Sequence, residues 1–78
     1  MVFLNGELIA LGEELANRLR AERDAKGWTQ ADLAERIGVS RKTINTIENG
    51  IFTPSTVIAL KLARAFKLTV EDLFSLRE

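Results

Sequence analysis

Side chains that carry hydrogen-bond donors recur at helical spacing between residues 41 and 49. At about 100° per residue, Ile44 and Ile47 point to one side of a helix, and the polar residues share the opposite arc. Guanidinium, ammonium, amide and hydroxyl groups can bind base edges or phosphate oxygens of a nucleic acid. The pattern therefore predicts a helix that buries one edge and presents a donor face. This donor face consists of Arg41, Lys42, Asn45, Thr46 and Asn49.

Catalytic and metal chemistry have little support in the composition. The 78 residues include no cysteine and no histidine, which excludes disulfides, thiolate ligands and the commonest metal ligand and general base. No nucleophile and base stand at catalytic spacing. We therefore expect that the protein is not an enzyme and holds no metal or other cofactor.

Two short helices joined by a tight turn are expected to position the donor face. Thr29 is a typical N-cap for the first helix, and Trp28 is placed to close its entry by a hydrophobic contact. Gly38 suits the left-handed position that ends this helix. Ser40 begins the second helix in the same way, and that helix runs to the C-cap signal at Gly50.

The spacing of small and apolar residues is that of a helix-turn-helix motif. Ala34 stands where the second helix must approach closely. From about Asn17 to Phe74, about three quarters of the chain, the sequence resembles the phage-repressor (Cro-like, or XRE) helix-turn-helix family. The resemblance implies an all-α, lambda-repressor-like five-helix domain that binds DNA. The matching residues are Arg23, Gly27, Thr29, Gln30, Leu33, Ala34, Gly38, Val39, Ser40, Ile44, Ile47, Glu48, Asn49, Gly50 and Pro54.

Three residues of the donor face match the positions that read bases in the resembled family. They are Arg41, Lys42 and Thr46. Arginine can grip guanine O6 and N7 with two donors, lysine can do so less directionally, and threonine can offer a hydroxyl or contact the thymine methyl group. We expect these side chains to enter the major groove.

Three further residues are expected to contact the DNA backbone. Gln30 opens the preceding helix, where its backbone N–H and its side chain can meet a phosphate at the positive helix end. Asn45 and Asn49 lie on the donor face beside the base readers. Their short amides suit phosphate contacts.

An ion pair is expected to hold the second motif helix in place. Arg23 lies one turn beyond Leu19 on the inward stripe of the first helix, so its charge needs a partner. Glu48 lies at the boundary of the inward arc of the donor-bearing helix. In the resembled family an arginine and a glutamate at these positions pair, which implies a structural role for Arg23 and not a DNA contact.

The chain is neutral overall, but its charge is uneven. Apolar residues make up 46% of the composition, which suits one small domain, and the formal net charge is zero. Residues 1–14 contain three acids and no basic residue, whereas residues 15–28 contain four basic residues against two acids. The DNA-facing part is therefore expected to be locally positive. Because no apolar run reaches membrane-spanning length and no basic flank marks a signal peptide, we expect a cytoplasmic protein.

Residues 1–12 lie outside the family resemblance. Asn5-Gly6 between two apolar runs predicts a type I′ β-hairpin. The alternative is that leucines at helical spacing extend the first helix backwards, an extension that two glycines would weaken. Such an apolar segment needs a packing partner, and we expect it to help form a homodimer. The predicted division is therefore an N-terminal extension, 1–12, and a helix-turn-helix domain, 13–78.

The remaining helices are predicted from caps and periodicity. The first spans residues 13–26, the fourth runs from Ser55 to near Lys67, and the last spans about 70–76. Lysine in a left-handed cap costs roughly 1 kcal/mol, so an irregular cap is predicted at Lys67.

Apolar residues near these helices lead to two further predictions. Phe52 is expected to anchor its loop by packing against the fourth helix. Val70, Phe74 and Leu76 exceed what a short last helix can bury alone, which favours a contribution to a dimer surface.

The function predicted first is a small dimeric repressor that binds double-stranded DNA at a palindromic operator. Two half-sites are needed because one helix reads only a few base pairs. A second hypothesis is a protein-protein adaptor of the same fold, which the zero net charge and Ile51 favour slightly. A third is an antitoxin-like repressor that also binds a toxin, as partner protein, through residues 1–12. None of these functions involves a membrane.

Overall fold

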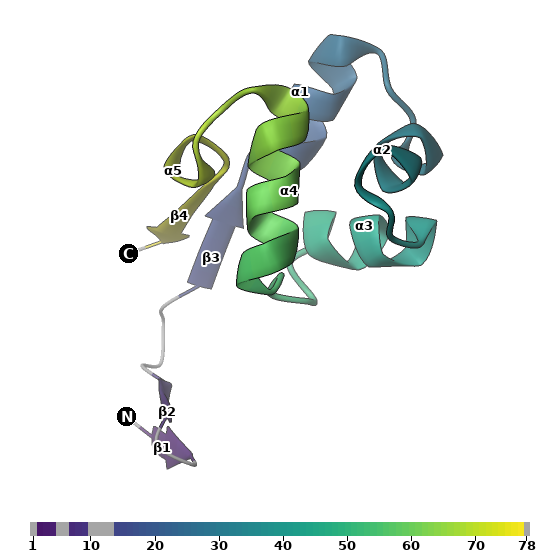
Figure 1. Ribbon diagram of the computed structural model, residues 1–78. Helices are drawn as coiled ribbons and strands as arrows, with labels where there is room; N and C mark the ends of the chain where they lie inside the picture. The colour runs from purple at the N-terminus through teal and green to yellow at the C-terminus, as the bar shows by residue number, and fades with distance from the viewer. Residues whose placement is uncertain (1, 5–6, 10–13, 78) are drawn as a thin grey trace.

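Helices make up most of the described chain, which comprises residues 2–4, 7–9 and 14–77 of the computed structural model. Five helices within these ranges pack into one body, and four short strands form two separate pairs (Figure 1). Among the described residues, no helix has the length and apolar character needed to span a bilayer. The helices are α1 (Leu19–Lys26), α2 (Gln30–Ile37), α3 (Arg41–Glu48), α4 (Thr56–Phe66) and α5 (Val70–Leu73). The strands are β1 (Val2–Leu4), β2 (Glu7–Ile9), β3 (Glu14–Asn17) and β4 (Phe74–Arg77).

The predicted N-caps are confirmed. The hydroxyl oxygen of each cap accepts a hydrogen bond from the backbone N–H three residues later. In α2 and α5 an aspartate carboxylate accepts a second hydrogen bond from the backbone N–H of the cap residue, which completes a capping box. These local bonds explain why four helices begin where the sequence predicts. The capping residues are Thr29, Ser40, Ser55 and Thr69.

The hydrophobic core lies where the five helices meet. Six large aliphatic side chains are almost completely inaccessible to solvent, and each contributes roughly 1.5 to 3 kcal/mol through burial. Trp28 closes one end of the core, with its ring centroid 5.2 Å from that of Phe66. Burial therefore fixes the position of α3 through its apolar edge. The six side chains are Leu19, Leu33, Ile44, Ile47, Leu62 and Leu73.

The first and last helices are shorter than predicted. The helix expected at 13–26 begins only at Leu19, and the helix expected at 70–76 ends at Leu73. The residues outside these limits form β3 and β4, which pair with each other antiparallel. This pairing is non-local, so periodicity along either segment alone could not reveal it.

The β3–β4 pair also changes the expected position of the C-terminal apolar residues. Leu15 lies opposite Leu76, and Asn17 lies opposite Phe74. Phe74 is only 7% exposed and belongs to the core of its own domain, whereas Leu76 is 64% exposed. Of these two residues, only Leu76 remains available for contact with another molecule.

The prediction of an irregular cap at Lys67 is wrong. Lys67 adopts left-handed backbone angles, φ 59° and ψ 41°, and is the one non-glycine residue with positive φ in the described ranges. Its backbone N–H donates to the carbonyl oxygens of Ala63 and Arg64. These bonds satisfy carbonyl groups at the end of α4, which offsets the steric cost of the side chain.

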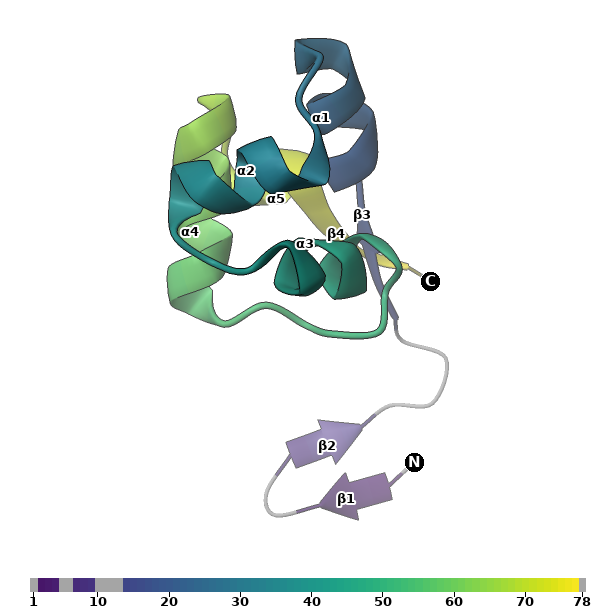
Figure 2. The ribbon, with the colours of Figure 1, turned by 90° about the vertical axis from the view of Figure 1, so that its right-hand side faces the viewer.

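The N-terminal extension contains the predicted hairpin. β1 and β2 pair antiparallel, with Val2 opposite Ile9 and Phe3 opposite Leu8. The Asn5-Gly6 turn itself lies outside the described residues. In Figures 1 and 2 the two strands lie apart from the helical body. The hairpin reading of this segment is therefore correct, and the backward helix extension is wrong.

Candidate nucleic-acid interface

Helix α3 presents the donor face and is held against α2 by its opposite edge. α2 and α3 lie side by side in Figure 2, joined by the short turn at Gly38. Ile44 and Ile47 are buried beneath α3, as predicted. The outer residues are exposed, except that Thr46 is half-buried. This is the arrangement needed for a helix to enter a groove while its inner edge stays anchored.

The first turn of α3 carries a free positive charge. Arg41 and Lys42 follow the Ser40 cap and are both exposed. This turn contains no acidic residue, and neither side chain forms an ion pair with another described residue. Their donors are therefore available to an external acceptor.

The hydroxyl group of Thr46 is already hydrogen-bonded within the helix. Its hydroxyl donates to the carbonyl oxygen of Thr43 at 3.0 Å. A threonine held in this way has its one O–H donor occupied, so it offers its methyl group and an acceptor lone pair to a base. The site can thus contact a thymine methyl group without breaking an internal bond.

Gln30 is oriented toward α3 and is only partly accessible. Its amide nitrogen donates to Glu48 Oε1 at 3.0 Å, and its amide oxygen accepts from Asn45 Nδ2 at 3.4 Å. Asn49 Nδ2 in turn donates to the backbone oxygen of Asn45 at 2.9 Å. The three predicted phosphate contacts are therefore linked by hydrogen bonds. In this arrangement the amide of Gln30 positions its neighbours and does not extend toward solvent.

Arg23 and Glu48 form a buried, two-point ion pair between α1 and α3. Arg23 Nε donates to Glu48 Oε2 at 2.7 Å, and Nη2 donates to Oε1 at 3.1 Å. Arg23 Nη1 also donates to the carbonyl oxygen of Trp28 at 2.8 Å. The hydrogen bond to Glu48 raises the pKa of Arg23 above its ordinary value, against the opposing effect of burial. The guanidinium therefore stays charged and inward.

Hydrogen bonds thus connect the buried pair to the outer surface. The path runs from Arg23 through Glu48 and Gln30 to Asn45 and Asn49, across three helices. Within the described part of the chain, every buried side-chain nitrogen or oxygen has a partner. A fully satisfied network of this kind favours one orientation of α3 relative to α1 and α2.

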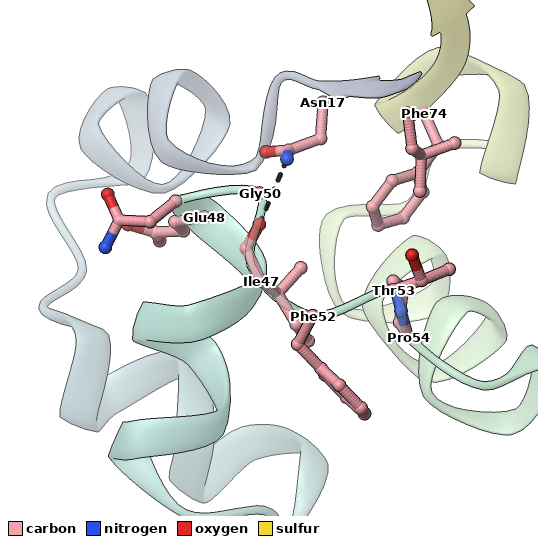
Figure 3. A pocket seen from close by; sticks show the side chains of 10 residues that line it. Asn17, Ile47, Glu48, Gly50, Phe52, Thr53, Pro54 and Phe74 are labelled. Carbon is pink, nitrogen blue, oxygen red and sulfur yellow. Dashed lines mark hydrogen bonds between the residues drawn. The ribbon is translucent and has the colours of Figure 1, made fainter. Parts of the chain in front are cut away.

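Asn17 is a positioning residue that the sequence reasoning missed. Its Nδ2 donates to the carbonyl oxygen of Ile47 at 3.1 Å, near the end of α3 (Figure 3). Its Oδ1 accepts from the backbone N–H of Leu19 at 3.1 Å, at the start of α1. One amide therefore joins β3, α1 and α3. An asparagine just before a helix is a recognisable capping signal, but its contact with residue 47 is visible only in the folded chain.

A polar groove borders the end of α3. It has a volume of about 450 Å³ and lies between β3, the loop after α3 and Phe74 (Figure 3). Phe52 lines this groove with 44% of its surface exposed, so the prediction of a loop anchor packed on α4 is wrong. Ile51 beside it is 77% exposed. Within the described residues, no cluster of potential metal-binding side chains occurs here or elsewhere.

Comparison with known proteins agrees with this geometry. The profile of the helix-turn-helix family matches residues 19–73. An uncharacterized helix-turn-helix transcriptional regulator, YgzD of Bacillus subtilis, is 39% identical over 64 residues, which cover 82% of this chain and 97% of that protein. The antitoxin HipB of Escherichia coli K12 is 32% identical over 57 residues, covering 73% of this chain and 65% of HipB.

A solved structure shows the same fold. The restriction-modification controller protein C.AhdI from Aeromonas hydrophila superposes with a TM-score of 0.67. It is 38% identical to this chain, and the match covers 70% of this chain and 83% of C.AhdI. The family profile matches residues 19–73, which include all five helices, so the similarity to the family extends to the elements that position the donor face.

Proposed function

Because the chain belongs to the helix-turn-helix family of transcriptional regulators, we propose that it is a small dimeric repressor that reads double-stranded DNA through α3. The observation that carries the proposal is the first turn of α3. Arg41 and Lys42 are exposed there without an acidic neighbour, on a helix fixed by a buried edge and a buried ion pair. Such a rigid, donor-rich helix fits the major groove.

The base-reading roles follow from which donors are free. Arg41 offers a guanidinium able to bind guanine O6 and N7 together, and Lys42 offers a less directional charge. Thr46 offers its methyl group because its hydroxyl is engaged with Thr43. This set favours a half-site that contains both a guanine and a thymine.

The phosphate contacts are assigned to the residues around this set. Asn45 and Asn49 are exposed and hydrogen-bonded to each other, which fixes their amides beside the base readers. Gln30 contributes through its backbone N–H at the start of α2, where the helix dipole favours an anion. Its side chain acts indirectly by holding Asn45.

A homodimer on a palindromic operator supplies the specificity that one domain lacks. Two copies related by a two-fold axis place their α3 helices in successive major grooves, about 34 Å apart along B-DNA. Each added half-site multiplies discrimination against non-specific sequence. A regulator of this kind works where the chromosome is, so we place it in the cytoplasm.

Salt-dependent binding tests the proposal directly. Fluorescence anisotropy of the full chain with duplexes from its own upstream region would be measured over a range of salt concentrations. Release of counterions from on the order of six phosphates predicts a slope of log K against log salt near −5. A slope near zero, or no binding at low salt, would contradict a DNA-binding role and favour the adaptor hypothesis.

A second candidate function is an antitoxin-like repressor, which the similarity to HipB favours. Such a protein would bind DNA through α3 and a toxin through another surface. Co-expression with the products of adjacent genes, followed by co-purification, tests this candidate. A stable complex that still binds the upstream duplex would support this candidate function. If none of the adjacent gene products co-purifies with the protein, this candidate function is wrong.

A further inference from the structure

Helix α4 has an exposed stripe that none of the contacts described above uses. The stripe consists of Val57, Leu60, Lys61 and Arg64, which follow the i, i+3, i+4, i+7 spacing of one helix face. Val57 is 60% exposed and Leu60 is 54% exposed. In Figure 1 this helix lies at the front of the molecule, and no other described element crosses it. The stripe is therefore apolar in its first half and basic in its second.

The apolar half continues into a groove. Leu60 shares with Leu15, Ala59, Val70 and Phe74 the lining of a hollow of about 210 Å³ beside α4. Most of the lining comes from β3, α4, α5 and β4, so the hollow belongs to the folded helical domain. An apolar hollow next to exposed aliphatic side chains is typical of a protein-contact surface.

Charge along the chain is complementary between this region and the N-terminus. Residues 49–70 contain three basic residues, Lys61, Arg64 and Lys67, and no acid. Residues 1–14 contain three acids and no lysine or arginine. Attraction between the two regions would be strongest at low ionic strength, where screening is weak.

The β1–β2 hairpin matches the stripe in composition. The six residues of its two strands, 2–4 and 7–9, comprise five apolar residues and one acid, Glu7. A two-stranded hairpin is only marginally stable without a surface to pack on. The α4 stripe offers such a surface, with aliphatic groups for the apolar residues and Lys61 for Glu7.

We propose that the β1–β2 hairpin of one copy docks on the α4 stripe of a second copy, and that the exchange is reciprocal. This inference rests on the proposed function in one respect, namely that operator recognition requires a two-fold dimer. Reciprocal docking gives two identical contacts related by a two-fold axis, as an isologous interface requires. Docking on the stripe of the same chain would create no dimer.

Two separate charge-reversal variants test this proposal. Glu7→Lys and Lys61→Glu would each be introduced into the full chain, and self-association would be measured by sedimentation at low salt without DNA. Each variant alone places like charges at both contacts, so we expect dimerisation to weaken about tenfold. A mixture of the two variants restores opposite charges at both contacts of the mixed dimer. We therefore expect the mixture to associate nearly as tightly as the wild type.

The result with the mixture separates exchange from docking within one chain. If the hairpin docks on its own α4, like charges remain in every molecule and mixing restores nothing, which would overturn the proposal. Unchanged association of both single variants, or a monomeric wild type, would also overturn it. None of the substitutions alters α3, so salt-dependent binding to non-specific duplex DNA, which does not require the dimer, can be judged separately by anisotropy with the same proteins.

An apolar substitution provides a second readout. Leu60→Ser should weaken dimerisation at least tenfold while the helical circular dichroism stays unchanged, because Leu60 is largely exposed in the single domain. Ile51→Ser is the matched control, since Ile51 is equally apolar and still more exposed but lies outside the stripe. Equal weakening by both substitutions, or by neither, would show that the stripe is not the docking surface.

Discussion

The buried pair between α1 and α3 allows a quantitative test of how α3 is held. Glu48 accepts three hydrogen bonds, two from Arg23 and one from Gln30, and its side chain is 2% exposed. Glu48→Ala would leave the guanidinium of Arg23 with the carbonyl oxygen of Trp28 and with the carboxylate of Asp24, which is 3.5 Å away but largely exposed to solvent. Removing one partner of a buried pair costs about 3 to 5 kcal/mol because the remaining charge is unpaired.

A double-mutant cycle measures the coupling energy between Arg23 and Glu48. Arg23→Ala and Glu48→Ala should each destabilise the domain strongly, while the double variant should lose much less than the sum of the two, by at least about 2 kcal/mol. Because a domain of this size has a total stability of only about 4 to 12 kcal/mol, the free energies should come from urea unfolding at low temperature.

The exposed pair Arg18–Glu22 is the internal control for this cycle. Its nitrogen and oxygen are 3.5 Å apart, and the arginine side chain is 67% exposed. A cycle on this pair should give a coupling below about 1 kcal/mol, since water and salt screen it. Additive losses for Arg23 and Glu48, or equal coupling in both pairs, would refute the view that burial makes the first pair a structural constraint.

Three further predictions concern the caps and the link to β3. Lys67→Gly should raise the free energy of unfolding by about 0.5 to 1 kcal/mol, because relief of the left-handed strain outweighs the added entropy of the unfolded chain, whereas Lys67→Ala should change little. Asn17→Ala should lower the free energy of unfolding in urea by about 1 to 2 kcal/mol, because both side-chain hydrogen bonds are lost. Asn17→Asp should lose less, because its carboxylate can still accept from the backbone N–H of Leu19 but cannot donate to Ile47. Bonds from the cap threonines, the backbone N–H first, lower the pKa of Asp32 and Asp72 in the folded state. Their contribution to stability is therefore complete above the unfolded pKa of about 3.9 and is lost as the pH falls through the lower folded pKa. Changing both aspartates to asparagine should therefore reduce the pH dependence of the free energy of unfolding in that acidic range.

Features set by neighbouring residues were predictable from the sequence. The N-caps at Thr29, Ser40, Ser55 and Thr69 depend on bonds that span three residues, so the residue types alone indicate them. The inward positions of Ile44 and Ile47 follow from helical periodicity. The donor face is accessible for the same reason.

Features set by distant residues were not predictable. Pairing of β3 with β4 depends on how the two ends of the domain meet, so helical periodicity was extended too far in both segments. The inward turn of Gln30 depends on Glu48 and Asn45, which approach it only when α2 packs on α3. Lys67 is a local exception: its backbone N–H donates to Ala63 and Arg64, only four and three residues earlier, so the sequence was compatible with a left-handed cap despite the steric cost.

Selection of binding sites from a random duplex library tests the central claim most directly. If α3 reads bases in a two-fold dimer, the wild type should enrich a palindrome whose half-sites are about one helical turn apart. Arg41→Ala should keep the spacing but lose preference at one base pair in each half-site, at a cost of about 1 to 3 kcal/mol on the original site. Enrichment of no motif by the wild type, or of the same motif by both proteins, would contradict the assignment of α3 as the recognition helix.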